Sequence, residues 1–271
     1  MPIPRERLES LTDFFQAIKL GPPSGPARND NASKVNQILS YLDIVNAQVA
    51  KLSKNRRLVF VDSGAGNCYL SFLLYHFFGI QMGRELEIHC IDTNARLMEN
   101  AERTAGVLGF RGMFFHEGDI SDFLHDGPVD VCYSLHACDT ATDKALFLGI
   151  RHQARCILSV SCCQHSMESS FRNRIVPPLA GYKSVKNRLV YMVADVMRAK
   201  LMEMHGYRAD IFDFTSSRNT DKNMMIRARK GPSRSSEALW DEYRFLREGF
   251  GIRPELERLL LQLKQCEKLA S

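Results

Sequence analysis

The residues best suited to chemistry follow an apolar run that predicts a buried strand over 58–61. Asp62, Gly64 and Gly66 come directly after this run, and a predicted helix begins just beyond them. Glycine has no side chain, so the backbone of such a turn can approach a ligand closely at the carboxyl end of a strand. The third glycine of a dinucleotide fingerprint is absent, so the turn fits a nucleoside-methionine ligand better than a pyrophosphate. A tight turn that binds no ligand is the alternative.

Two further acidic residues follow the ends of the next two predicted strands. Asp92 ends the second strand, where a carboxylate can accept two hydrogen bonds from a ribose diol. Asp119 and Ile120 follow the third strand, where Asp119 can accept a hydrogen bond from the exocyclic amine of adenine and Ile120 can pack on the ring. A helix cap at Asp92 and a plain turn at 117–120 are the alternatives. Three acidic strand ends in this order are more specific than any one of them.

The elements that would position these residues alternate between short apolar runs and helical stretches. Strands are predicted over 58–61, 86–91, 112–116, 129–135, 156–160, 207–214 and 223–228, and helices over 33–52, 68–78, 94–108, 143–150 and 189–205. This alternation implies right-handed crossovers and a parallel sheet covered on both faces. The short polar connection at 215–222 favours an antiparallel hairpin at a sheet edge. We therefore predict a doubly wound, mostly parallel, seven-stranded Rossmann-like α/β sheet with an antiparallel last strand.

Helical extensions are predicted before and after this sheet. Breaker residues at 21–26 indicate a loop or hinge, and 231–236 reads as a linker. The segment 240–268 predicts one or two helices, broken near Gly251 and Pro254. The predicted organisation is an N-terminal helical extension over 1–52, a ligand-binding domain over 53–230 and a C-terminal helical extension over 231–271.

Composition argues against several other classes of protein. Hydrophobic residues make up 45% and charged residues 25% of the 271 positions, which is ordinary for a folded globular chain. We expect neither a membrane span nor a secretory signal, because no long apolar run occurs and none follows the N-terminus. Eight cysteines form no CxxC pair and several lie in apolar runs, which favours the reducing cytoplasm. A net charge of +5 permits an anionic partner without requiring one.

Longer strings in the chain resemble a known family. They are VDSGAGNCYLSFLLYHFF, HACDTATDKAL, SVSCCQH, RLVYMVADVMRAKLMEMHGYRADIFDF and KNMMIRA. Over residues 33–229 the chain is similar to the methyltransferase-domain family typified by the methyltransferase-like 25 proteins and bacterial relatives. The resemblance implies the class I fold, S-adenosylmethionine as the cofactor and methyl transfer as the activity. Asn67 and Cys68 stand where this family leads us to expect Lys-Ser, a departure that concerns details of cofactor contact.

In the fold that this resemblance implies, the end of the fourth strand faces the transferred methyl group. His136, Cys138 and Asp139 stand there and are the predicted catalytic residues. His136 can act as a general base because the pKa of imidazole lies near neutrality, and orienting the substrate or closing the pocket are its alternative roles. Asp143, one helical turn after Asp139, either shares its face or caps the helix.

Cysteines also follow the fifth predicted strand. We expect Cys162, Cys163 and His165 to line the floor of a substrate pocket without a covalent role. A zinc site that includes Cys138 is one alternative, although the usual CxxC spacing is absent. A nucleophilic cysteine, as in RNA cytosine-5 methyltransferases, is another, although the flanking residues do not match that group. We therefore predict no metal site.

The segment 166–188 is basic and carries aromatic residues. In the implied fold it would lie over the acceptor pocket, where Arg172 and Arg174 can neutralise phosphates and Tyr182 can stack on an unpaired base. A solvated loop whose arginines pair with nearby carboxylates is the alternative.

Together these patterns predict a cytoplasmic S-adenosylmethionine-dependent methyltransferase that acts on RNA, with tRNA or rRNA as the natural substrates. A protein or small-molecule acceptor, or a non-catalytic module that binds the cofactor and a partner, are the alternatives. No Asn-Pro-Pro-Tyr or Asp-Pro-Pro-Tyr string follows the fourth strand, which argues against methylation of a base N6 amine. We expect no membrane association, and a monomer.

Overall fold

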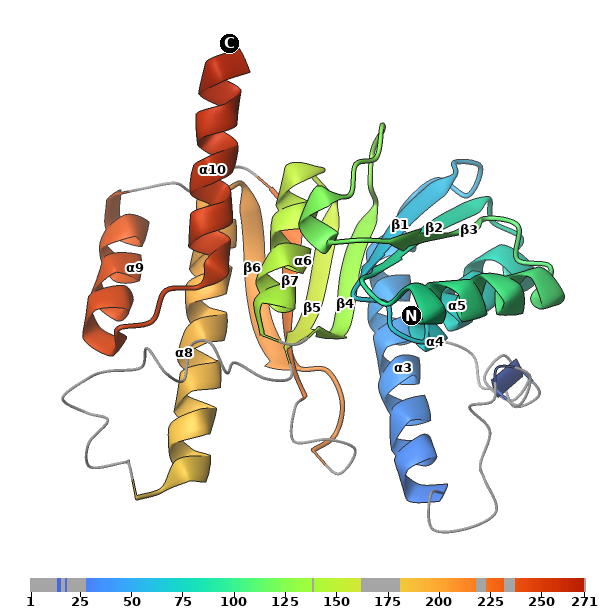
Figure 1. The fold of residues 1–271 in the computed structure, drawn as a ribbon, viewed down its shortest axis with the longest axis horizontal. Coiled ribbons are helices and arrows are strands. Elements are labelled where there is room, and N and C mark those ends of the chain that lie inside the picture. Colours follow the sequence, from blue (N-terminus) through green and yellow to red (C-terminus); the bar gives the residue numbers. More distant parts are fainter. Residues whose placement is uncertain are drawn as a thin grey trace. The chain divides into compact units, whose positions relative to one another are not determined.

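The computed structural model describes residues 14, 15, 18, 28–137, 139–161, 181–217, 223–231 and 237–270. Its strands form a seven-stranded sheet in the order β3-β2-β1-β4-β5-β7-β6 (Figure 1). Strand β7 runs antiparallel to β5, whereas the pairs β1–β2, β2–β3 and β4–β5 are parallel. The predicted doubly wound, mostly parallel sheet with an antiparallel last strand is confirmed, and the last two strands are neighbours at one edge as expected. By its contacts the chain divides into two compact units.

The first unit comprises residues 1–118 and 213–223. Its elements are α3 (Arg28–Val49), β1 (Leu58–Ser63), α4 (Tyr69–Leu74), η1 (Tyr75–Gln81), β2 (Leu86–Asp92), α5 (Ala95–Leu108) and β3 (Met113–Glu117). Every residue of β1 is buried, which explains why this strand reads as a continuous apolar run and not as an alternating one. The register sets Asp62 beside Cys90 and Asp92 beside Glu117.

Helix α5 shows how local sequence sets an element boundary. Its N-cap Asn94 accepts a hydrogen bond from the backbone nitrogen of Leu97 through Oδ1 at 3.2 Å. The helix ends at Gly109, whose φ of 71° lies in the left-handed region that glycine adopts without strain. Both signals are local in the chain, so the predicted helix over 94–108 agrees with the structure.

The helix predicted over 68–78 is not uniform. It is α-helical over α4 and becomes π-helical over η1. The hydroxyl of Tyr75 accepts a hydrogen bond from the backbone nitrogen of Gly112 at 3.0 Å, and the adjacent Phe77 and Phe78 are both buried. The helix thus widens at the residue that makes this contact with a distant part of the chain.

The second unit comprises residues 119–212 and 224–271. Its elements are η2 (Ile120–Asp122), β4 (Val131–Ala137), α6 (Thr140–Arg151), β5 (Cys156–Ser161), α8 (Lys183–Met204), β6 (Tyr207–Asp213), β7 (Met224–Lys230), α9 (Glu237–Phe250) and α10 (Glu255–Ala270). The break between α9 and α10 falls at Gly251 and Pro254, as predicted. Helix α8 begins six residues before its predicted start at 189, because residues 183–188 are mostly polar and carry little apolar periodicity.

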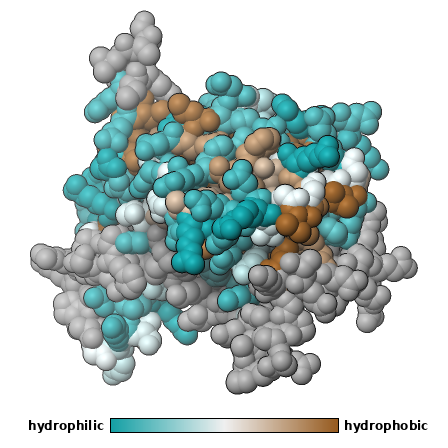
Figure 2. Space-filling model, turned by 45° about the vertical axis from the view of Figure 1, so that its right-hand side comes forward, coloured by the Kyte–Doolittle hydropathy of each residue, from teal (hydrophilic) through white to brown (hydrophobic). Residues whose placement is uncertain are grey.

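The surface contains both polar and apolar residues. Figure 2 shows a face on which hydrophilic side chains predominate and hydrophobic ones gather in smaller groups. Among the described helices, none combines the length and the apolar character that crossing a membrane would need.

Candidate functional site

The glycine turn after β1 adopts a backbone that most side chains disfavour. Gly64, Gly66 and Cys68 have φ angles of 79°, 53° and 56°, all in the left-handed region. A Cβ atom built on Gly66 would meet no other atom within 4 Å, so the space beside this residue is open. The bare backbone that the sequence predicted is therefore present, with room for a ligand next to it.

Asp92 holds this turn at the end of β2. Its Oδ2 accepts a hydrogen bond from the backbone nitrogen of Gly66 at 2.9 Å, and its Oδ1 accepts one from Asn94 at 2.9 Å. The backbone nitrogen of Gly64 donates to the carbonyl of Ile91, also at 2.9 Å. A carboxylate has about four acceptor positions, so both oxygens retain capacity for ligand hydroxyls. The structure thus shows Asp92 holding the backbone of the turn. Its hydrogen bonds to a ribose stay a prediction.

Asp62 is buried at the end of β1, with 3% of its surface exposed. Ser71 of α4 donates a hydrogen bond from Oγ to Asp62 Oδ2 at 2.5 Å. Burial raises the pKa of Asp62 to about 7; the bond from Ser71 opposes this rise and the charge of Asp92 adds to it. In this structure Asp62 joins β1 to α4, and its direct contact with a cofactor stays a prediction.

Cys68, the residue that departs from the family pattern, is buried at the N-cap of α4. Its Sγ lies 3.8 Å from the carbonyl oxygen of Gly66. A hydrogen bond with Cys90, together with burial, raises the pKa of the Cys68 thiol far above its usual range. The thiol therefore stays protonated and packs as a small apolar group, because the nucleophilic form of cysteine is the thiolate.

Asp119 begins the 3₁₀ turn η2, and Ile120 behind it is buried. Asp119 Oδ1 accepts hydrogen bonds from Ser121, from the backbone nitrogen at 2.9 Å and from Oγ at 2.6 Å, while Oδ2 accepts one from Lys144 Nζ. Burial opposes ionisation, but the bonds from Lys144 and Ser121 outweigh it and lower the pKa of Asp119 to about 2. Both oxygens thus have protein partners, which supports the alternative of a structural turn. Contact with adenine stays a prediction for both residues.

The end of β4 carries local backbone strain. The pairing with β5 shifts between Leu135 and Ala137, so His136 is the extra residue of a β-bulge, with φ 61°. Asp139 has φ 54° and ψ −121°. Non-glycine residues in such regions cost about 1–3 kcal/mol each and cluster at functional sites, and bulges redirect side chains there. The half-buried His136 and Asp139 remain the predicted catalytic residues, and Cys138 lies outside the described residues.

Asp143 neither shares an open face with Asp139 nor caps its helix, so both sequence expectations for it are wrong. It is fully buried, and Arg198 donates to both of its carboxylate oxygens, from Nε at 3.0 Å and from Nη2 at 2.6 Å. Arg198 Nη1 also donates to Asp195 Oδ1 at 3.1 Å. Ser161 Oγ donates to Asp195 Oδ2 at 3.1 Å.

This buried network fixes the start of α6, the middle of α8 and the end of β5 relative to one another. The network was not predicted from the sequence, although a signal was present. Asp195 and Arg198 stand at positions that the periodicity of the predicted helix over 189–205 assigns to the buried face. A charged residue at such a position needs an opposite charge nearby.

Most of the predicted substrate-binding residues lie outside the described residues: Cys162, Cys163, His165, Arg172 and Arg174. The thiol-lined pocket floor and its zinc and nucleophile alternatives are therefore untested. Tyr182 is described and stands just before α8, with 67% of its surface exposed.

The strand order, with an antiparallel β7, is that of the class I methyltransferases that the resemblance implies, and the open glycine turn suits a nucleoside ligand. A family model described as a methyltransferase domain matches residues 33–170, just over half of the chain. The chain belongs to this methyltransferase-domain family. Among curated proteins, no sequence matches it significantly.

Solved structures share this fold at low sequence identity. The CMeT domain of citrinin polyketide synthase is 13% identical with a TM-score of 0.50, over 83% of this chain and 65% of that one. Magnesium protoporphyrin IX methyltransferase from Synechocystis PCC 6803, solved with SAH, is 13% identical with a TM-score of 0.49, over 82% of this chain and 99% of that one. TrmK of M. capricolum, also solved with SAH, is 14% identical with a TM-score of 0.39, over 72% of each chain. Identities of this size relate the folds alone.

Proposed function

We propose that this methyltransferase domain takes its methyl group from S-adenosylmethionine and transfers it to RNA in the cytoplasm. The observation that carries the cofactor assignment is the open glycine turn, held by the hydrogen bond between Gly66 and Asp92. A side-chain-free backbone beside a carboxylate with spare acceptor capacity suits an adenosyl group, whose ribose offers two hydroxyl donors. Four cysteines buried as free thiols, Cys68, Cys90, Cys132 and Cys156, suit a reducing compartment.

The protein needs to contribute little covalent chemistry to this reaction. The sulfonium of the cofactor supplies an activated methyl group, so the protein mainly aligns the acceptor and removes its proton where needed. We assign proton removal to His136, because a neutral imidazole accepts a proton near physiological pH. The β-bulge at His136 gives that ring an orientation that a regular strand would not.

The first turn of α8 supports RNA as the acceptor. Tyr182 is largely exposed, and Lys183, Lys186 and Arg188 follow it with no acidic residue between them. An exposed ring can stack on an unpaired base, while cations neutralise the adjacent phosphates. A protein or small-molecule acceptor remains the second candidate, and the experiment below distinguishes the two.

The test is to supply the protein with S-adenosylmethionine labelled in its methyl group, together with fractionated cell extract. We expect the label to enter RNA and to be released by ribonuclease. Label that enters only protein or small molecules would refute the RNA acceptor while leaving methyl transfer intact. Tight cofactor binding without transfer to any fraction would favour a non-catalytic binding module.

A further inference from the structure

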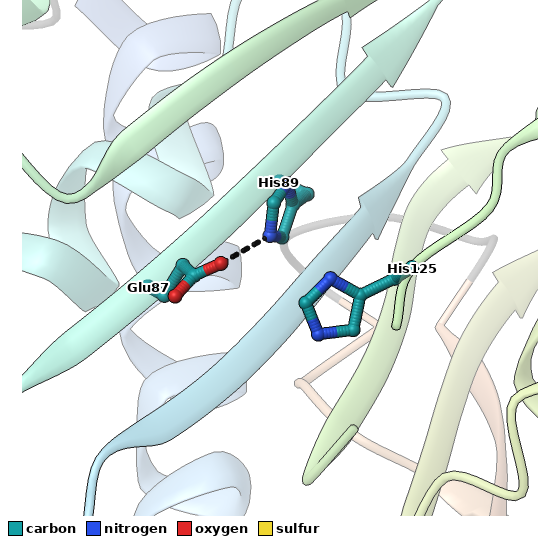
Figure 3. Close-up of side chains that lie close together, drawn as sticks. All are labelled: Glu87, His89 and His125. Carbon is teal, nitrogen blue, oxygen red and sulfur yellow. Dashed lines mark hydrogen bonds and ion pairs between the residues drawn. The ribbon is translucent and has the colours of Figure 1, made fainter. Parts of the chain in front are cut away.

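A second cluster of chemically capable side chains lies in the first unit, on residues that the proposed function does not use. Glu87 and His89 stand two positions apart on β2, so they project from the same face of the strand (Figure 3). His116 stands on the neighbouring β3, where the register pairs it with Ile91. His116 is therefore a diagonal neighbour of His89 on that face.

Hydrogen bonds define the protonation of these rings. His89 Nε2 lies 2.8 Å from Glu87 Oε1, the contact drawn as a dashed line in Figure 3. An ionised carboxylate can only accept, so the hydrogen is on Nε2 of His89 and a neutral ring keeps a lone pair on Nδ1. That Nδ1 lies 3.0 Å from His116 Nε2, and when the His89 ring is neutral it accepts the hydrogen of His116 Nε2. Arg57 Nη1 pairs with the other oxygen of Glu87 at 3.0 Å, which holds Glu87 in place.

This arrangement matches the way proteins prepare histidines for metal ions. Zn²⁺ binds imidazole nitrogen at about 2.0–2.1 Å, so two nitrogens in a tetrahedral site stand about 3.3 Å apart. The observed 3.0 Å differs from this by only a few tenths of an ångström. A ligand histidine almost always donates its other N–H to a carboxylate or carbonyl, which fixes the ring and makes the ligand nitrogen more basic. Glu87 makes that contact to His89.

We propose that His89 Nδ1 and His116 Nε2 bind a first-row transition-metal cation with the preferences of Zn²⁺, and that Glu87 orients His89. On binding, the hydrogen of His116 moves from Nε2 to Nδ1, so the ring changes tautomer without a net loss of a proton. Water completes the coordination.

The test is calorimetric titration of the metal-free full-length protein with Zn²⁺. Cysteines can also bind Zn²⁺, so the decisive quantity is the difference between wild type and variants. We expect His89→Gln and His116→Gln each to lose one equivalent of bound Zn²⁺. Glu87→Gln should keep that equivalent but bind it about 10–100-fold more weakly. The control is His205→Gln, because His205 Nδ1 lies 2.7 Å from the Leu201 carbonyl in the last turn of α8.

Unchanged stoichiometry and affinity in both ligand variants would overturn the proposal. Far-UV circular dichroism in chelator shows whether the variants fold without metal. If the variants do not fold, X-ray absorption of the Zn²⁺-loaded wild type still tests the proposal. Imidazole neighbours at about 2.0 Å would support it, and a shell of sulfur alone at about 2.3 Å would overturn it. Neither outcome bears on methyl transfer, because the cluster shares no residue with the cofactor turn.

Discussion

Replacing Asp92 by asparagine tests the cofactor turn most directly. The carboxylate accepts backbone hydrogen bonds from Gly66 and Asn94, one on each oxygen. An amide offers one acceptor oxygen and turns a donor toward the other nitrogen, so one of these two bonds is lost. A hydrogen bond to a charged group contributes about 1.5–3 kcal/mol. We expect Asp92→Asn to lower the free energy of unfolding by about this amount, measured by urea denaturation.

The same substitution should weaken cofactor binding. In the variant, the ribose diol loses a charged hydrogen-bond acceptor, and fewer hydrogen bonds hold the turn beside it. A loss of about 1.5–3 kcal/mol corresponds to a Kd for S-adenosylmethionine about 10–150-fold higher, measured by calorimetry. Asp241→Asn is the matched control, because its side chain is 65% exposed on α9 and its ion-pair partner Arg244 is also a surface residue. A folded Asp92→Asn variant whose Kd equals that of wild type would refute the reasoning.

Three further predictions concern the second unit, the buried acid and the RNA. Arg198→Met leaves Asp143 and Asp195 buried without their cation, and should destabilise the protein by about 3–5 kcal/mol in chemical denaturation. The pKa of Asp62 is raised to about 7, so the stability linked to its protonation is fully present below about pH 4 and is lost as pH rises through 7. Asp62→Asn should remove that decline from a profile of unfolding free energy against pH. Tyr182→Ala should weaken binding of tRNA, used as the probe, about 5–150-fold in a filter-binding assay, the effect of losing one stacked base.

Each of these has an outcome that contradicts it. Arg244→Met, at an exposed ion pair, should leave the free energy of unfolding almost unchanged, and an equally small effect at Arg198 would show that the buried network does not stabilise the fold. A pH profile with the same slope in Asp62→Asn and wild type would show that another group titrates. Phe245→Ala removes an aromatic side chain that is 75% exposed on α9, and an equal loss of tRNA binding there would argue against stacking at Tyr182.

Much of the fold could be predicted because its signals are local. Apolar runs and the glycine turn act within a few residues, and each element they predict is present in the structure. Two helices differ from the prediction. The π-helical turn begins at Tyr75, which contacts Gly112 37 positions away, and the start of α8 is polar and has no apolar pattern to reveal it.

The candidate site, like the fold, could be predicted from the sequence only in part. Residue types and spacing were enough to single out Gly64, Gly66 and Asp92 as a turn suited to a nucleoside, because bare backbone and a strand-end carboxylate are properties of short segments. The second role of Asp92, as a hydrogen-bond acceptor for the backbone of the turn, was not predicted from the sequence. Both interpretations of Asp143 from the sequence, sharing the face of Asp139 or capping the helix, are contradicted by its burial and its hydrogen bonds with Arg198.

The sequence by itself thus determined the order of elements and the presence of a glycine turn after β1, since both follow from neighbouring residues. Only the tertiary structure decided which side chains become partners. Asp143 and Arg198 are 55 positions apart, and His89 and His116 are 27 apart. Such pairs meet because the sheet brings separate strands and helices together, and a hydrogen bond depends on distance and angle, which spacing along the chain does not encode.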